Sequence, residues 1–403
     1  MDGMDLQTRI FALPDPLTDL EGRPVKTADA WMNHRRAELF RLFQDHVYGR
    51  TPEGPSEKAV FEETERLDGA LSGKAIRIQG NVLCRGVPEG IRPFPVLMYL
   101  PRFAGEGGGG PVPVFLGLNF KGNHAISEDP GILISPNGRS PDGILLHERG
   151  CASRRYSLED LMDSGFGLVT LWNHDVEADR PGSWGGSPRG AYSRGAEPGL
   201  QEWGTIGAWA WGLSRVLDAL EGIPEVDASR VIVWGHSRLG KTALWASASD
   251  PRFAMAISND SGCTGAALTR FKQGESIAEI NRRFPHWFCG NYKQYGEDPI
   301  KLPVDQHELI ALSAPRPVYV ASGVEDLWAD PPSEFLAARQ ASVVYRLFGL
   351  EGIPENEGMP EVLHPVGGRG VGYHVRTGGH DVTAYDWKQF IAFAEKNLSL
   401  GKQ

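Results

Sequence analysis

Short apolar segments alternate with segments of helical spacing along most of the chain. Apolar runs rich in β-branched residues predict strands at 59–67, 75–84, 94–100, 112–118, 167–172, 231–234, 253–258 and 317–322. Apolar residues three and four positions apart predict helices at 28–47, 206–220, 330–350 (from Ser333) and 386–398. The helix at 206–220 has the clearest amphipathic pattern. Strands that alternate with helices, without an internal repeat, favour an α/β fold with a mostly parallel sheet.

Three long polar segments interrupt this alternation, at 125–160, 173–199 and 262–300. They are too long for structureless loops of a compact domain, so we expect insertions that form the rim of a site. Residues 1–25 predict an extended N-terminal arm, and residues 26–403 a single catalytic domain. The glycine run Gly105–Gly110 predicts a hairpin-like connection between two strands. It lacks the Lys and Ser/Thr of a phosphate-binding loop.

The segment from Val231 to Trp245 predicts a strand, a tight turn and a helix that starts at about Arg238. Its turn contains Gly235-His236-Ser237, and the next glycine, Gly240, lies one position later than in the nucleophile elbow Gly-x-Ser-x-Gly. An elbow serine sits in a strained turn that exposes its hydroxyl beside free backbone N–H groups. The alternative is an ordinary strand–helix turn in which Ser237 caps the helix.

Composition narrows the classes of partner. The 403 residues include 41 basic and 51 acidic side chains, for a net charge of −10, and no basic cluster stands out. Nucleic acid and anionic membrane surfaces are therefore not expected partners. No apolar run is long enough for a transmembrane helix. Met1–Phe11 is too polar for a signal peptide, so the sequence is either cytoplasmic or a mature form with a new start.

The four cysteines lack the spacing of a zinc site or of a Cys-x-x-Cys motif; they are Cys84, Cys151, Cys263 and Cys289. We expect four free thiols, with a bridge between Cys263 and Cys289 as the alternative.

An elbow serine needs a base, and His380 is the first candidate. It follows two glycines in Gly378-Gly379-His380-Asp381, directly before the last predicted helix, where α/β-hydrolases carry this residue. His374 is its rival, and a solvated loop histidine is the non-catalytic alternative. No metal or organic cofactor is implied.

The acid that orients the base is expected after the next-to-last strand. Gly323-Val324-Glu325-Asp326 follows the strand at 317–322, so Asp326 is the first choice and the adjacent Glu325 stays possible. Asp260, in Ser258-Asn259-Asp260-Ser261-Gly262, ends the strand after the elbow helix and is the alternative acid. The residues alone leave the ranking open.

At this point the chain resembles the glucuronoyl esterases, a carbohydrate esterase family with the α/β-hydrolase fold, a three-layer α/β/α sandwich. The family signature Gly-Cys-Ser-Arg-x-Gly-Lys is matched by Gly235-His236-Ser237-Arg238-Leu239-Gly240-Lys241. The likeness continues, in order, through Ser258–Gly262, Gly274-Glu275, Pro285–Phe288, Asp326–Pro331 and Gly379-His380. It covers roughly residues 25–398, and the joint occurrence of these motifs is specific.

The resemblance implies a serine carboxylesterase that cleaves esters of 4-O-methyl-glucuronic acid, as between xylan and lignin, through an acyl-enzyme on Ser237. Arg238 would hold the oxyanion, with backbone N–H groups of the loop at 119–123. Lys241 and Glu275 would contact the sugar, and Trp328 would lie beside its ring. The family also suggests a secreted or periplasmic enzyme whose signal has been removed, and we expect a monomer.

Two departures from the family pattern carry expectations of their own. His236 replaces the signature cysteine, and Asp381 stands where fungal members have its disulfide partner, so we expect a polar contact between these two side chains. Asp260 stands where many members have a catalytic glutamate. Aspartate is one methylene shorter, which shifts the preference to Asp326.

Two other functions remain open at the level of sequence. One is an esterase of the same fold that acts on acetylated or other small carbohydrate esters. The other is a non-catalytic carbohydrate-binding protein on a hydrolase fold, which the intact serine, histidine and carboxylates disfavour.

Overall fold

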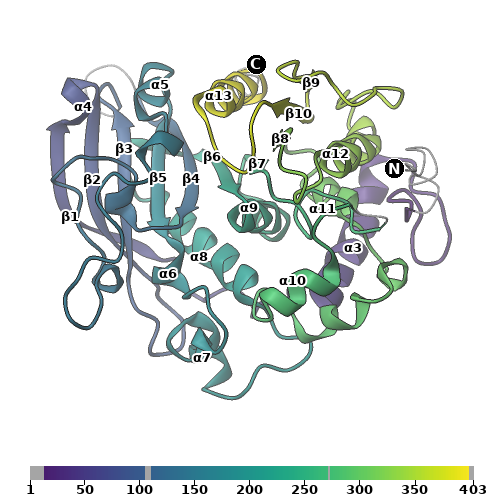
Figure 1. Ribbon diagram of the computed structural model, residues 1–403, viewed down its shortest axis with the longest axis horizontal. Helices are drawn as coiled ribbons and strands as arrows, with labels where there is room; N and C mark the ends of the chain where they lie inside the picture. The colour runs from purple at the N-terminus through teal and green to yellow at the C-terminus, as the bar shows by residue number, and fades with distance from the viewer. Residues whose placement is uncertain (1–12, 105–109, 271–272, 399–403) are drawn as a thin grey trace.

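The computed structural model describes residues 13–104, 110–270 and 273–398. Within them, one mixed sheet has the strand order β1-β2-β3-β5-β4-β6-β7-β8-β10-β9 (Figure 1). The strands are β1 Val60–Gly69, β2 Ala75–Leu83, β3 Phe94–Pro101, β4 Val112–Asn119, β5 Gly167–Trp172, β6 Val226–His236, β7 Met255–Asn259, β8 Val318–Gly323, β9 Val366–Gly367 and β10 Val371–Arg376. Strands β5, β4, β6, β7, β8 and β10 run parallel, so their carboxyl ends meet at one edge.

The connection between β3 and β4 is not a hairpin, contrary to the sequence prediction. β5 lies between these strands, antiparallel to β3 and parallel to β4. A glycine run is equally compatible with a tight turn and with a wider crossing, so composition alone does not choose between them. Most of the run, residues 105–109, lies outside the described residues.

Successive side chains on each strand point to opposite faces of the sheet and pack into two separate hydrophobic layers. Phe115 and Ile232 pack with helices α5 (Leu158–Asp163) and α13 (Ala384–Leu398). Their neighbours Leu116 and Val233 pack on the opposite face with α8 (Thr205–Leu220) and α9 (Arg238–Ser249). Figure 1 shows α5 and α13 on one side of the sheet, with α8 and α9 on the other. The fold is therefore the expected three-layer α/β/α arrangement.

Helix α8 differs from its prediction, because every one of its residues is buried. Its sheet-facing side is apolar, as expected. Its other side lies under the insertion at 173–199, where Tyr192 contacts the ring of Trp211 at a centroid distance of 6.0 Å. Asp218, a polar residue of this helix, is paired with Arg252 at 2.7 Å. An amphipathic pattern therefore marked a helix whose polar side is covered by other parts of the chain.

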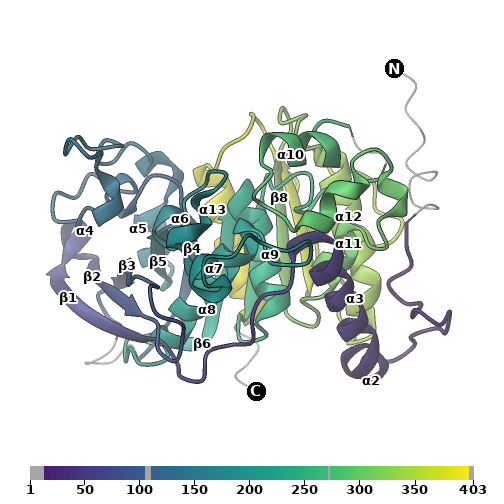
Figure 2. The same cartoon turned by 90° about the horizontal axis from the view of Figure 1, so that it is seen from below.

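The N-terminal helical segment lies against elements from the second half of the chain (Figure 2). It is continuous from α2 (Ala28–Ala30) through the π-helical η1 (Trp31–Arg35) and α3 (Arg36–Phe43) to the π-helical η2 (Gln44–Tyr48). Arg36 donates to the carbonyls of Ala248 and Leu312, at 2.8 and 2.9 Å, and thereby joins this segment to the ends of α9 and α11 (Gln306–Ala311).

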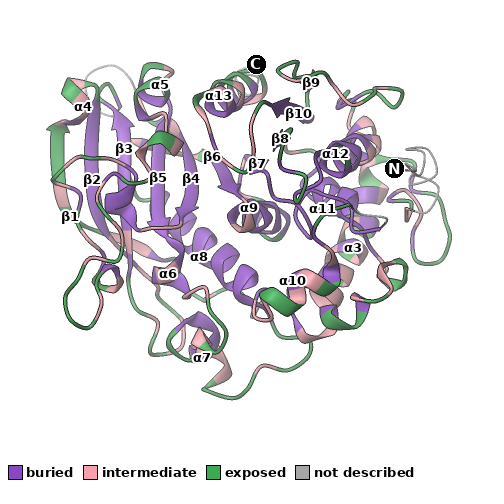
Figure 3. Ribbon diagram, viewed as in Figure 1, coloured by how far each residue is buried: buried purple, intermediate pink, exposed green. Residues whose placement is uncertain are grey.

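The described residues of the three predicted insertions contain only short helical elements, and these insertions border the carboxyl edge of the sheet. These elements are η3 Asn123–Ala125, η4 Pro136–Gly138, η5 Ser153–Arg155, α6 Asn173–Val176, η6 Ser183–Gly186, α7 Pro188–Ser193, α10 Ile277–Arg283, η7 Gly290–Tyr295 and η8 Pro299–Lys301. Figure 3 shows the central strands mostly buried, whereas β1 and much of the insertions are exposed. α4 (Ala70–Gly73) and α12 (Pro331–Arg346) complete the helices. All four cysteines are free thiols, so Cys263 and Cys289 form no bridge.

Among the described residues, no helix combines the length and the apolar character that crossing a membrane requires.

Candidate active site

Ser237 occupies the tight turn between β6 and α9, in a strained conformation with φ 58° and ψ −130°. Gly235 is required here, because a Cβ atom would lie 2.1 Å from the carbonyl oxygen of Leu239. The Ser237 amide donates to the carbonyl of Asn259 at 2.8 Å, which fixes the turn to β7. Its hydroxyl makes no capping hydrogen bond to the helix, so the interpretation of Ser237 as an ordinary N-cap is not supported.

His380 and Asp326 meet beside this serine. His380 lies on the loop between β10 and α13, and Asp326 follows β8. His380 Nδ1 lies 2.5 Å from Asp326 Oδ2. A carboxylate can only accept, so Nδ1 carries the proton and Nε2 is left as the acceptor. Ser237, His380 and Asp326 all line one cavity of about 300 Å³. Among the described residues, no hydrogen bond joins the serine hydroxyl to the histidine, as is common before substrate binds.

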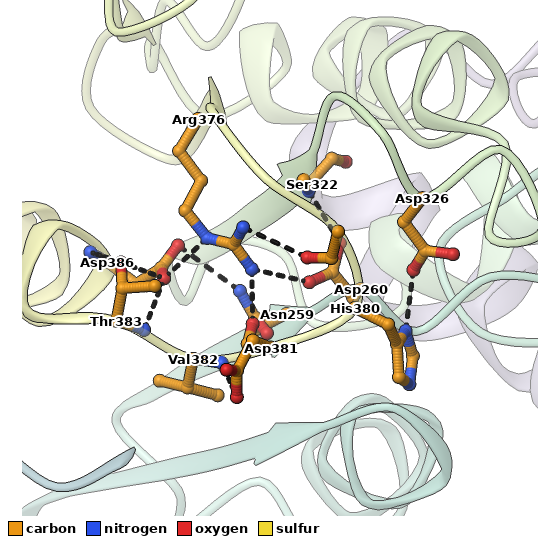
Figure 4. Close-up of polar contacts among 12 residues, drawn as sticks. Asn259, Asp260, Ser322, Asp326, Arg376, His380, Asp381, Val382, Thr383 and Asp386 are labelled. Carbon is orange, nitrogen blue, oxygen red and sulfur yellow. Dashed lines mark hydrogen bonds and ion pairs between the residues drawn. The ribbon is translucent and has the colours of Figure 1, made fainter. Parts of the chain in front are cut away.

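Asp260 also lines this cavity, but its hydrogen bonds go elsewhere (Figure 4). Its Oδ1 accepts from the Gly323 amide at 2.6 Å, and its Oδ2 from Arg376 Nη2 at 2.9 Å. Burial, followed by the negative charge of Glu334, raises the pKa of Asp260 well above its ordinary value. Acceptor atoms of Asp260 and Asp326 and a ring nitrogen of His380 lie within 4.8 Å of one another, yet only Asp326 is hydrogen-bonded to the histidine.

The two remaining alternatives lie away from this arrangement. His374 is fully buried in β10, where its ring nitrogens contact Tyr319 Oη at 3.0 Å and Asp386 Oδ1 at 2.9 Å. It therefore has no access to the cavity. Glu325 has an exposed side chain, and its backbone amide donates to the Gly378 carbonyl at 3.0 Å.

The trio Asp260, Asp326 and His380 has the donor types of a metal site. The guanidinium of Arg376 already donates a hydrogen bond to one oxygen of Asp260, and His380 Nδ1 donates one to Asp326. A cation would have to displace both contacts, so these residues fit an acid–base arrangement better than a metal centre.

Arg238, the first residue of α9, is fixed between a carboxylate and three aromatic rings. Its Nη1 donates to Asp179 Oδ2 at 2.5 Å, and its guanidinium lies 4.7 Å from the ring centroid of Trp287. Asp179 also accepts from His286 Nε2 at 2.9 Å and from Trp287 Nε1 at 2.7 Å. Burial opposes ionisation of Asp179, but these bonds and the arginine charge outweigh it and lower its pKa to about 2. Arg238 Nε is buried without a hydrogen-bond partner, and Arg238 lines the same cavity as Ser237.

Three further predicted residues line the same cavity. Lys241 lies one helical turn after Ser237, is buried, and donates to the carbonyls of Ser261 and Cys263. Glu275 is buried, with an oxygen 3.6 Å from Arg283 Nη1. Trp328 is 45% exposed, and its ring lies 5.6 Å from the guanidinium of Arg283. The cavity thus offers a cation, a carboxylate and an aromatic face next to the serine.

Comparisons with known proteins agree with this geometry. A family described as fungal glucuronyl esterase matches residues 197–349. The carbohydrate esterase MZ0003, from an unknown prokaryotic organism, is 42% identical over 99% of this chain and 92% of its own. The glucuronoyl esterase from Solibacter usitatus is 40% identical, covers 95% of this chain and 97% of its own, and superposes with a TM-score of 0.88. The chain belongs to the glucuronoyl esterase family. Its members are carboxylic ester hydrolases, so the non-catalytic interpretation is not supported.

Two further relatives bear on substrate. The 4-O-methyl-glucuronoyl methylesterase of Schizophyllum commune is 28% identical over 87% of this chain and 76% of its own. A structure described as a promiscuous family 15 carbohydrate esterase, from a marine bacterial metagenome, is 41% identical, covers 96% of each chain and has a TM-score of 0.84.

This glucuronoyl esterase does not join His236 to Asp381, and that prediction was wrong. His236 Nδ1 contacts Asn259 Oδ1 at 2.6 Å, and its ring lies 4.5 Å from that of His380. Asp381 instead pairs with Arg154 and, at 2.6 Å, with Arg155. The η5 turn brings two guanidinium groups to Asp381, and they outcompete a histidine whose pKa burial and the nearby His380 charge hold low.

Asp179, Arg283 and Arg376 contribute to the site of this esterase but were not predicted. Asp179 lies in the insertion at 173–199, and nothing in its local sequence marks it as the partner of Arg238. Trp287 lies in the family motif Pro285–Phe288, so the sequence marked this residue but did not indicate that it contacts Arg238.

Proposed function

We propose that this chain hydrolyses esters of 4-O-methyl-glucuronic acid, with Ser237 as nucleophile, His380 as base and Asp326 as the acid that orients it. One observation carries the proposal. A strained serine, a histidine paired with a carboxylate and an arginine held by Asp179 line a single cavity that also contains a buried lysine and a buried glutamate. Acyl transfer requires the first three groups, and recognition of a sugar acid uses the last two.

The reaction divides into two half-reactions. Ser237 Oγ attacks the C6 carbonyl carbon of the sugar acid, while His380 Nε2 takes the hydroxyl proton. Asp326 holds the imidazolium that forms, through the 2.5 Å contact at Nδ1. His380 then gives the proton to the alcohol, which leaves. Water attacks the acyl-enzyme with His380 again as base, and frees Ser237 and the carboxylic acid.

Arg238 stabilises the negative charge that grows on the carbonyl oxygen. Its Nε has no other partner, and its backbone amide, at the first helical position, has none within the helix. Asp179 and Trp287 hold the guanidinium in place before the reaction, so little reorganisation is needed. Backbone N–H groups of the loop at 119–123 are the expected additional donors.

The sugar is proposed to lie between Lys241, Glu275 and Trp328. Lys241 brings an amino group to the cavity, Glu275 supplies acceptors, and the exposed ring of Trp328 gives a flat apolar surface. The name of the Schizophyllum commune relative specifies a 4-O-methyl-glucuronoyl ester, which supports this substrate class.

The test is turnover of methyl and benzyl glucuronate by the wild-type chain and by Ser237→Ala. We expect hydrolysis of both esters by the wild type and a loss of at least about 10³-fold in the variant. Retained turnover in Ser237→Ala would overturn the nucleophile. Absence of turnover by a wild type that reacts with a serine-directed fluorophosphonate would overturn the substrate and keep the chemistry.

A second candidate is an esterase of the same mechanism with a broader range of carbohydrate esters. The marine metagenome relative is described as promiscuous, and it is as similar to this chain as the Solibacter enzyme. A higher kcat/KM on acetylated xylan than on benzyl glucuronate would favour this alternative. The pair Lys241 and Glu275 favours the sugar acid, since an acetyl group would contact neither.

A further inference from the structure

Arg376, the last residue of β10, makes an unusual number of hydrogen bonds for a buried side chain. It is 2% exposed and donates from all three of its guanidinium nitrogens (Figure 4). Three of its acceptors are backbone carbonyls in the loop that carries His380. They are Thr377 O at 2.9 Å, Gly379 O at 3.0 Å and Asp381 O.

The same guanidinium is anchored on the sheet side by two buried carboxylates. Nε donates to Asp386 Oδ2 at 2.7 Å, and Nη2 to Asp260 Oδ2 at 2.9 Å. Asp386 lies in the first turn of α13, and Asp260 is itself fixed by the Gly323 amide at the end of β8. Arg376 therefore joins β7, β10 and α13 to one short loop.

This loop needs an external clamp, because its own sequence gives it little rigidity. It contains Gly378, at φ 86°, and Gly379, and no helix or strand covers residues 377–383. Two backbone bonds tie it to the Asp326 segment, from Val324 N to Arg376 O at 2.8 Å and from Glu325 N to Gly378 O at 3.0 Å. Among the described residues, Arg376 is the one side chain that donates to the carbonyls on both sides of His380.

We propose that Arg376 is a positioning residue for catalysis. It fixes the loop at 377–381 so that His380 stays paired with Asp326 and directed toward Ser237, and Asp260 acts on the reaction only through Arg376. The inference rests on the proposed roles of Ser237, His380 and Asp326. Asp260, which lines the cavity without a hydrogen bond to the base, then serves to anchor Arg376. Arg376 itself takes no direct part in the reaction.

The test compares Arg376→Lys with a matched control, Arg316→Lys. Lysine keeps the charge but cannot reach five acceptors with one nitrogen. Arg316 is a second arginine that clamps backbone carbonyls, with Ser247 O at 2.8 Å and Phe253 O at 3.0 Å. It precedes β8 at the opposite end from the site, so its loss should lower stability without touching the histidine loop.

We expect Arg376→Lys to lower kcat by about 10²-fold, because small misplacement of a catalytic group has effects of that size. KM for methyl glucuronate and the affinity for free glucuronic acid should change by less than about threefold, since the sugar contacts are intact. Arg316→Lys should lower Tm while kcat stays within about twofold of the wild type. An unchanged kcat in Arg376→Lys, or a parallel loss of kcat and glucuronate affinity in both variants, would overturn the inference.

Hydrolysis of 4-nitrophenyl acetate tests the role of Arg376 independently of the proposed substrate. Positioning of His380 affects the hydrolysis of any ester, so kcat on 4-nitrophenyl acetate should fall by a similar factor in Arg376→Lys. A wild type that cleaves this ester but not methyl glucuronate would remove the proposed substrate and leave the test of Arg376 valid.

Asp386→Asn is the second variant, for the case that Arg376→Lys does not fold. It keeps the guanidinium and weakens one of its anchors, together with the contacts of Asp386 to His374 and to the Thr383 amide. We expect faster amide hydrogen exchange in residues 377–383 and a fall in kcat of about tenfold. Faster exchange with unchanged kcat would contradict a positioning role, as would unchanged exchange and kcat.

Discussion

Asp326 and Asp260 follow neighbouring parallel strands, β8 and β7, and both lie beside His380, yet they have different partners. Asp326 Oδ2 accepts from the histidine, and its Oδ1 from the Ala329 amide at 3.2 Å. Both oxygens of Asp260 are taken by Gly323 and Arg376. Both carboxylates have an oxygen within 4.8 Å of a His380 ring nitrogen, but only Asp326 is hydrogen-bonded to it. The two carboxylates differ in their hydrogen-bond donors. Asp326 is bound by the histidine, whereas Asp260 is bound by Arg376, which holds the loop that carries the histidine.

Asp326→Asn should have the largest effect on activity and is the strongest test of this comparison. An asparagine keeps the shape but no longer fixes the proton on Nδ1 or stabilises the imidazolium, so kcat should fall by about 10³- to 10⁴-fold. KM for methyl glucuronate should stay within about threefold, since the proposed sugar contacts of Lys241, Glu275 and Trp328 are unchanged. Steady-state kinetics of the purified variant check this, with thermal unfolding to verify the fold. Turnover close to that of the wild type would assign the acid role elsewhere.

Arg238→Lys should have the next largest effect, because it alters the donors and leaves both carboxylates in place. The three N–H groups of lysine share one nitrogen and lack the planar spread of a guanidinium, so lysine holds Asp179 and the carbonyl oxygen less well and kcat should fall by about 10²-fold. Reaction with a fluorophosphonate should slow in parallel, since that reagent also develops negative charge at Ser237. Lys293→Arg, an exposed change on η7, is the control. A kcat equal to that of the wild type would show that backbone amides alone hold the oxyanion.

Asp260→Asn should lower kcat only about tenfold, because Asp260 acts through Arg376 and not on the histidine directly. The smaller loss than in Asp326→Asn would distinguish the roles of the two carboxylates. Asparagine keeps the shape of the side chain and one acceptor oxygen. The side-chain carbonyl can still accept from Gly323, and Asp386 still binds Arg376. A loss as large as that of Asp326→Asn would assign Asp260 a direct role on the histidine.

Two strands of the parallel half, β5 and β8, could be predicted closely from sequence because they are buried on both faces, whereas β6 (226–236) is longer than the predicted 231–234. β5 begins and ends where the apolar run does, and β8 differs by one residue at each end. β10 was missed because His374 and Arg376 interrupt its pattern. Both polar side chains are buried against Asp386, a residue from another element, and such a partner is invisible in a local window.

In the candidate site, too, local motifs could be predicted and contacts between distant residues could not. The serine elbow and the histidine loop are local motifs, since glycines at fixed positions permit turns that other residues would block. The pairs that fix them are distant in sequence: Asp179 lies 59 residues from Arg238, and Asp260 lies 116 from Arg376. The predicted contact between His236 and Asp381 failed for this reason, because Arg154 and Arg155 arrive from an insertion whose fold the sequence did not specify.

The smallest predicted effect on activity comes from Asp175, a carboxylate outside the cavity that extends the same comparison to stability. Ser135 and Asn137 donate only to its Oδ1, and its Oδ2 is buried without a partner. Its pKa is raised to about 6 by burial, whereas Asp179, with donors on both oxygens, has a pKa of about 2. Between pH 4 and 6 the folded state of Asp175 therefore binds more protons than the unfolded state, and its contribution to stability falls as the pH rises.

Asp175→Asn removes this titration while its amide oxygen still accepts from Ser135 and Asn137. The free energy of unfolding of the variant, relative to the wild type, should therefore rise by about 3 kcal/mol between pH 4 and pH 7, because two pKa units correspond to that energy. Urea denaturation at the two pH values measures the difference. kcat should be unchanged, since Asp175 does not line the cavity. A relative stability that is independent of pH would show that Asp175 stays charged in the fold, and that donors on a single oxygen are enough to keep it so.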